Sequence, residues 1–109
     1  MTLHLALPKG RMQDGIRQLL AAAGIRLSLD PRRYRPVLSL PDVDTKLLKP
    51  RDVVTLLDQG SRDVGFAGAD WVSELGADIV PLLDTGLAPV RLVLAAPPGA
   101  GKTTVVPLA

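Results

Sequence analysis

The segment of residues 3–7 is a mainly apolar run that leads directly into Pro8-Lys9-Gly10-Arg11, and a helical pattern follows at once. A short apolar run bounded by proline and glycine predicts a buried β-strand, and the residues behind it predict a tight turn that opens into a helix. A buried strand that feeds a helix restricts the chain to folds in which helices cover a sheet.

The remaining apolar spacings repeat this alternation of strand and helix. Apolar residues recur at helical spacing from residue 11 onward, and Gly24 suits the position that ends such a helix. Two more helices are predicted, one that begins near Pro50 and ends at Gly60 and one over residues 71–75. The predicted strands cover residues 25–29, 37–40, 46–48, 63–67, 79–83 and 90–95. This order predicts an α/β fold with a mixed, mostly parallel sheet flanked by helices, and 109 residues suffice for one domain.

The composition narrows the classes of function. There are 13 basic and 11 acidic residues, which gives a net charge of +2, and aromatic residues make up only 3%. Neither a nucleic-acid-binding surface nor a set of base-stacking side chains is therefore indicated. The sequence lacks an apolar run of about 18 residues and the layout of a signal peptide, so we expect no membrane span and a cytoplasmic location.

Metal and redox chemistry have few possible ligands in this chain. Cysteine is absent, which excludes disulfides and cysteine-based zinc sites. His4 is the only histidine, and it falls inside a predicted strand. We therefore expect no metal centre and no catalytic histidine.

In open sheets of this kind, ligands bind at the carboxyl ends of the strands. Lys9 and Arg11 follow the first strand and lie at a helix N-terminus, where unpaired N–H groups already favour an anion. The arrangement suits a phosphate or another polyanion. Alternatively, both are solvated cations in a turn, at a cost of about 0.3–1 kcal/mol each because they oppose the helix dipole.

A second strand end carries Gly68 and Asp70. Glycine there permits a close backbone approach or a positive φ angle. Asp70 is either an ordinary N-terminal helix residue, which is slightly favoured, or a hydrogen-bond acceptor for a ribose hydroxyl or a base. Arg51 begins another helix and is a candidate anion contact; its alternative is a surface salt bridge.

The C-terminal stretch fits the looser form of a phosphate-loop pattern from Ala96 to Thr103, and its key residues are Gly101, Lys102 and Thr103. It follows a predicted strand, as such a loop should. Only six residues follow Thr103, however, so the required helix has at most one or two turns, and no later strand can supply a magnesium-binding aspartate. A working NTPase site is not expected from this sequence.

Four motifs in order, LALPKGRM, AAAGI, LLKPRDVVTLLDQGSRDVGFAGADWV and LLDTGLAPVRLVLAAP, resemble the ATP phosphoribosyltransferase family of histidine biosynthesis. The resemblance covers about residues 3–97. It implies transfer of phosphoribose from phosphoribosyl pyrophosphate to N1 of the adenine of ATP, with Mg²⁺ required alongside the substrate phosphates. The implied fold is one lobe of a pair of periplasmic-binding-protein-like α/β domains, with the active site between the lobes.

The same resemblance implies which residues line that cleft. Lys9, Gly10 and Arg11 match the family's cleft-lining turn, and Arg51 and Asp70 match positions close to it. Cations there can neutralise the charge of a triphosphate or of departing pyrophosphate. No residue is identified as a general base, so the catalytic residues are left unassigned.

The sequence also departs from the family. The family's acidic, Thr/Gly-rich loop for phosphoribosyl pyrophosphate belongs to a second lobe that has no counterpart here. We therefore expect residues 1–97 to form an incomplete first lobe, followed by an atypical tail over residues 98–109 that looks like the phosphate loop of a helicase. A nucleotide- or anion-binding half-domain without catalysis, and a phosphate-loop ATPase fragment, remain alternatives.

Partners are likewise implied by the resemblance. Members of the family work as dimers or larger assemblies, and the short form of the enzyme needs a regulatory subunit that resembles histidyl-tRNA synthetase. We expect a homo-oligomer, because an incomplete lobe leaves apolar surface uncovered.

Overall fold

A computed structural model describes residues 2–10, 12–30, 35–87 and 92–99 of the chain. Seven strands and three helices lie within this part. In chain order they are β1 (Leu3–Pro8), α1 (Gln13–Ala22), β2 (Leu27–Asp30), β3 (Arg35–Leu38), β4 (Val43–Leu48), α2 (Pro50–Asp58), β5 (Val64–Gly68), α3 (Ala69–Leu75), β6 (Val80–Asp84) and β7 (Leu92–Ala96).

Five of the strands form one sheet in the order β4-β1-β5-β7-β6. Strands β4 and β5 run parallel to β1, whereas β7 runs antiparallel to its two neighbours, β5 and β6. In the described sheet, β7 is therefore the strand whose direction is opposite to the other four. The predicted mixed, mostly parallel α/β sheet is confirmed.

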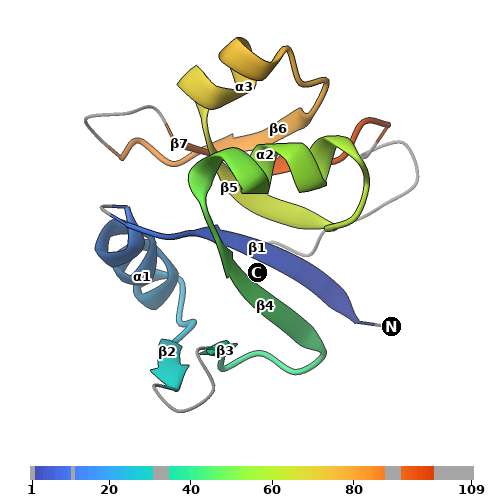
Figure 1. The fold of residues 1–109 in the computed structure, drawn as a ribbon. Coiled ribbons are helices and arrows are strands. Elements are labelled where there is room, and N and C mark those ends of the chain that lie inside the picture. The colour runs from blue at the N-terminus through green and yellow to red at the C-terminus, as the bar shows by residue number, and fades with distance from the viewer. Residues whose placement is uncertain (1, 11, 31–34, 88–91, 100–109) are drawn as a thin grey trace.

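Helices cover both faces of this sheet (Figure 1). Alternate residues of the central strands point to opposite faces, so that Leu5 and Leu7 of β1 join one core cluster and Ala6 joins the other. The first cluster packs under α1, which contributes Ile16, and under the β2–β3 hairpin. The second cluster packs under α2 and α3.

Gly65 of β5 allows α2 to lie close to the sheet. A Cβ at this position would come within 3.1 Å of both Val53 Cγ1 and Leu57 Cδ1, and within 3.2 Å of Ala6 Cβ. Val53 and Leu57 are fully buried there. The absence of a side chain at Gly65 therefore sets the distance between helix and sheet.

A buried arginine joins β1 to β4 away from the carboxyl ends of these strands. The Arg62 guanidinium donates hydrogen bonds to the carbonyl oxygens of Leu5 (2.6 Å) and Asp44 (2.8 Å), and to Asp44 Oδ2 (3.2 Å). His4 precedes Leu5 on β1, and its Nδ1 is 3.0 Å from Oδ2 of Asp63, the residue after Arg62. The Arg62–Leu5 and Asp63–His4 contacts hold the residues directly before β5 against the amino-terminal half of β1.

Several predicted bounds were wrong by one to three residues. Helix α1 begins at Gln13 rather than at residue 11, although Gly24 follows it with φ +81°, as expected for its end. Strand β4 begins at Val43 rather than at residue 46, because Asp42 adopts φ +58° and its carbonyl accepts a 2.8 Å hydrogen bond from the Leu3 amide. The start of the last predicted strand falls at residues 90–91, outside the described part.

Candidate functional site

The carboxyl ends of four strands meet at one edge of the sheet. Strand register aligns Pro8 of β1 with Leu48 of β4, and both Gly68 of β5 and Asp84 of β6 align with the beginning of β7. We call this edge the carboxyl edge. It lies toward the left of the view in Figure 1, where α1 and α2 begin.

The turn after β1 is held against the end of β4. The Lys9 amide donates a 2.8 Å hydrogen bond to the Leu48 carbonyl, and the Gln13 amide donates one of 3.1 Å to the Gly10 carbonyl. Gly10 has φ +103°, a conformation that favours glycine, and the space around its Cα is open. Lys9 is exposed at this turn, whereas Arg11 lies outside the described residues.

The end of β4 adds two more cations beside this turn. Lys49 is the N-cap of α2, Pro50 is its first residue and Arg51 its second, and the side chains of Lys49 and Arg51 are exposed. The N-cap makes no side-chain hydrogen bond to the helix. Lys49 was not among the predicted site residues, although its position after a strand and next to Arg51 was a usable signal.

The cations at this edge have no acidic partners within the part of the chain that the structure describes. The ion pairs between described residues are His4–Asp63 and Arg62–Asp44, and neither involves a cation of the carboxyl edge. The side chains of Lys9, Lys49 and Arg51 thus stay available to an external anion. Unpaired N–H groups and the positive end of the α2 dipole add to the same field.

Gly68 and Asp70 lie at the same edge but with different surroundings. Gly68 is buried and has φ −73° and ψ 131°, so of the two predicted alternatives for this glycine, the positive φ angle is wrong. It instead pairs with Leu92 in the β5–β7 ladder. Asp70 is exposed in the first turn of α3, which is the ordinary N-terminal helix position; a contact with ribose or base stays a prediction.

A loop that sequence reasoning did not single out also reaches the carboxyl edge. Residues 84–87, the 84–87 loop, begin at Asp84, the last residue of β6. Thr85 Oγ1 donates a 2.8 Å hydrogen bond to the Leu92 carbonyl, and the Gly86 amide donates one of 3.0 Å to Asp84 Oδ1. The sequence marks this loop by Asp-Thr-Gly after a predicted strand. Its position at the carboxyl edge, however, follows from the antiparallel pairing of β6 with β7, which the sequence does not show.

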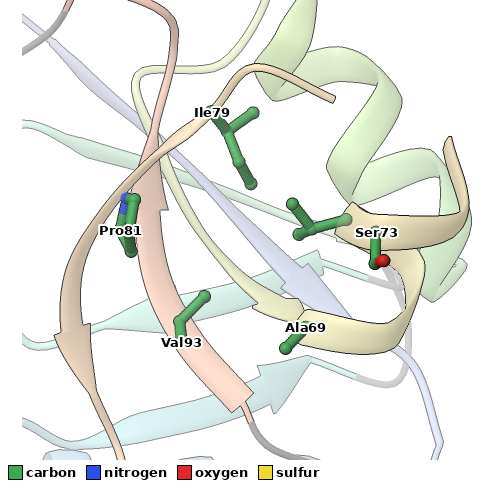
Figure 2. Close-up of a pocket in the computed structure, with 6 residues that line it drawn as sticks. Ala69, Ser73, Ile79, Pro81 and Val93 are labelled. Atoms are coloured by element: carbon green, nitrogen blue, oxygen red, sulfur yellow. The ribbon is translucent and has the colours of Figure 1, made fainter. Parts of the chain in front are cut away.

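The pocket shown in Figure 2 lies on a face of the sheet and reaches the carboxyl edge at Ala69 and Val93. Its volume is about 200 Å³, and it opens between α3 and the strands β6 and β7. Ser73 is the one hydrogen-bonding side chain among its lining residues, which are Ala69, Val72, Ser73, Ile79, Pro81 and Val93. The lining therefore lacks the polar groups that would orient a nucleotide base.

The described residues contain no group of three or more His, Asp or Glu side chains that could hold a metal ion. The side chains of this part of the chain therefore do not form a dedicated Mg²⁺ site. No helix in the described part is long and apolar enough to cross a membrane. The predicted phosphate-loop residues Gly101, Lys102 and Thr103 lie outside the described residues.

Comparisons with known proteins agree on one family. The sequence model of the family described as HisG: ATP phosphoribosyltransferase matches residues 49–107, which is more than half of the chain and extends into the tail. The ATP phosphoribosyltransferase of Chlorobium phaeovibrioides is 35% identical over 108 residues, covering 94% of this chain and 37% of that protein. That of Chlorobaculum parvum is 36% identical over 100 residues, covering 87% of this chain and 34% of that protein.

A solved structure gives the same result for the fold. The ATP phosphoribosyl transferase (HisG:HisZ) complex from Thermotoga maritima contains a chain that superposes with a TM-score of 0.60 at 26% identity. The match covers 76% of this chain and 40% of that chain. This chain thus spans little more than a third of the length of the curated relatives cited above.

Proposed function

Because this chain belongs to the ATP phosphoribosyltransferase family, we propose that its carboxyl edge forms one wall of a phosphoribosyl-transfer site. The reaction joins N1 of the adenine of ATP to the anomeric carbon of phosphoribosyl pyrophosphate and releases pyrophosphate. In the family it is the first step of histidine biosynthesis. This chain's contribution is to bind and orient the phosphate-bearing groups.

The observation that carries the proposal is the convergence of three cations on the ends of two paired strands. Lys9 follows β1, Lys49 and Arg51 follow β4, and the 2.8 Å hydrogen bond from Lys9 N to the Leu48 carbonyl holds the two strand ends together. Negative charge gathers on pyrophosphate as its bond to the ribose breaks. Cations already in place at that point stabilise this charge without reorganisation.

The proposal extends to partners and location. The similar structure from Thermotoga maritima is a HisG:HisZ complex. We propose that this chain works in an oligomer and with a regulatory subunit of that kind. A cytoplasmic location and a requirement for Mg²⁺ bound to substrate phosphates follow from the same family membership.

A second candidate function is nucleotide or anion binding without turnover. One observation favours it: Lys9, Lys49 and Arg51 of the carboxyl edge all belong to this chain, while the chain covers only 37% of the Chlorobium phaeovibrioides enzyme. The two candidates share the binding step and differ only in catalysis.

Two measurements on the chain separate these outcomes. Titration calorimetry with pyrophosphate and with ATP should show binding that weakens in Lys9→Ala; equal binding by the variant would refute the proposed edge site. Incubation of labelled ATP with phosphoribosyl pyrophosphate and Mg²⁺ then decides catalysis. Formation of N1-(5-phosphoribosyl)-ATP supports the transferase, and binding without product supports the second candidate.

A further inference from the structure

Helix α1 meets the 84–87 loop through a glycine. A Cβ built on Gly15, in the first turn of α1, would lie 3.3 Å from Leu87 Cδ1 and 3.4 Å from Leu87 Cδ2. Glycine near the start of a helix costs about 0.5–1 kcal/mol relative to alanine. Gly15 has an ordinary negative φ angle, so the room that it leaves for Leu87, rather than its backbone, explains its presence.

The position of Leu87 is set by the hydroxyl of Thr85. Thr85 Oγ1 donates a 2.8 Å hydrogen bond to the Leu92 carbonyl of β7 and accepts one of 3.3 Å from the Leu87 amide. The Thr85 amide also donates to the Leu92 carbonyl, at 3.1 Å. Gly86, between them, has φ +70°. The loop is thereby fixed to the beginning of β7, and Leu87 is directed toward α1.

The first turn of α1 is in turn bonded to the cationic turn after β1. The Gln13 amide donates to the Gly10 carbonyl at 3.1 Å, and the Ile16 amide donates to the Met12 carbonyl at 3.0 Å. A shift of Gly15 relative to the sheet therefore moves Gly10 and the neighbouring Lys9. Ile16 is the buried anchor of this helix, so the contact between Leu87 and Gly15 acts close to its docking point.

We propose that Thr85, Leu87 and Gly15 are positioning residues for the anion site: the Thr85 hydroxyl holds Leu87 in the notch at Gly15, and this contact sets the placement of the Lys9–Gly10 turn. The inference rests on the proposed function insofar as that turn binds phosphate. The mechanical part, the coupling of the 84–87 loop to the first turn of α1, stands on the contacts alone.

The first test measures hydrogen exchange of backbone amides by NMR in the whole chain. Thr85→Val keeps the side-chain size but removes the hydroxyl, and it should speed exchange at Gln13 and Ile16 roughly five- to tenfold, while Ala67 in β5 is unaffected. Thr85→Ser keeps the hydroxyl and should exchange like the parent. Unchanged exchange in folded Thr85→Val would overturn the inference whether or not the chain binds an anion.

The second test is a double-mutant cycle that stays informative if Thr85→Val does not fold. Gly15→Ala should fail to raise the thermal midpoint in the parent, because the new methyl group meets Leu87, but should raise it when Leu87 is also changed to alanine. Gln18→Ala, on the exposed side of the same helix, is the control, and its effect on the thermal midpoint should be the same with leucine or alanine at position 87. Equal effects of Gly15→Ala in both backgrounds would contradict the proposed contact.

Titration with pyrophosphate connects the contact to the site. Affinity should fall roughly threefold or more in Thr85→Val and remain within about twofold in Thr85→Ser. If the parent chain binds no pyrophosphate, the proposed function fails while the exchange experiment still decides the coupling. If the parent binds and Thr85→Val binds equally well, the positioning role is overturned and the proposed function is untouched.

Discussion

Lys9 and Leu48 are separated by 38 intervening residues, yet the Lys9 amide donates a 2.8 Å hydrogen bond to the Leu48 carbonyl. The bond continues the parallel register of β1 and β4 past Pro8. It brings the turn after β1 beside the N-cap of α2, and so sets Lys9 next to Lys49.

Removal of the Lys9 charge should weaken pyrophosphate binding. Charge-assisted contacts contribute about 1.5–3 kcal/mol, so Lys9→Ala should lose roughly tenfold or more in affinity, measured by titration calorimetry. Lys46→Ala is the matched control, because Lys46 is exposed on β4 two residues before its end. Raising the salt concentration should weaken binding by the parent and narrow its difference from Lys9→Ala. Equal losses in the two variants would point to general charge attraction instead of a defined site.

Gly10→Ala should damage the turn although nothing obstructs the added methyl group. The backbone at Gly10 has φ +103° and open surroundings, so the expected cost of about 1–2 kcal/mol is backbone strain alone. Urea unfolding measures that cost. Gly60→Ala has a similar strain at φ +76° after α2. Of the two variants, only Gly10→Ala should also weaken pyrophosphate binding; preserved binding would mean that the turn geometry does not matter to the site.

Gly65→Ala should destabilise the fold by overpacking. The new Cβ would be 3.1 Å from Val53 Cγ1 and Leu57 Cδ1, which forces α2 away from the sheet at an expected cost of about 1–3 kcal/mol. Thermal unfolding measures the effect. The same substitution made in a Val53→Ala background should cost less, because part of the obstruction is gone. Additive costs in the double variant would show that the contact is not the cause.

Arg62→Met should be among the more destabilising single changes in the described part. It leaves the Leu5 and Asp44 carbonyls without the guanidinium that bonds both, at 2.6 and 2.8 Å, and the expected cost is about 2–4 kcal/mol. Urea unfolding provides the measurement. Arg17→Met, at an exposed position of α1, tests the loss of an arginine charge without these bonds. A similar small loss in both variants would remove Arg62 as the link between β1 and β4.

His4→Ala should change little. The His4–Asp63 pair has side chains that are 46% and 47% exposed, and exposed pairs contribute about 0–1 kcal/mol. His4 also lies toward the start of β1, whereas the candidate site lies beyond its end. Pyrophosphate binding and any transferase activity should therefore equal those of the parent. A large loss of turnover with an unchanged unfolding midpoint would give His4 a catalytic role that the fold does not suggest.

The local units of the fold were predictable because each depends on near neighbours in the chain. Apolar spacing predicts α1 and α2, and Gly24 and Gly60 adopt the positive φ angles that end these helices. The pattern of strand, turn and helix also placed the candidate anion contact Lys9 after a strand and the candidate Arg51 at the start of a helix, where the structure has them. The family resemblance, carried by the same motifs, is confirmed by the match to residues 49–107.

Pairings between distant strands were not predictable from local spacing. Strand β7 lies between β5 and β6 and runs against both, and this insertion alone carries the 84–87 loop to the side of α1. The start of β4 depends on the Asp42 carbonyl, which accepts a hydrogen bond from the Leu3 amide of the neighbouring strand β1, 39 residues earlier in the chain. The spacing of apolar residues around one of these strands does not indicate which distant strand pairs with it.

The sequence by itself determined the helices, the strands, the α/β class and the cations that follow two strand ends, because periodicity, glycine and proline act over a few residues. Tertiary structure alone decided that Lys9 lies beside Lys49 and that Leu87 packs into the notch at Gly15. Those contacts join segments far apart in the chain. They form only when burial of two apolar faces selects one order of strands among several that the same local pattern allows.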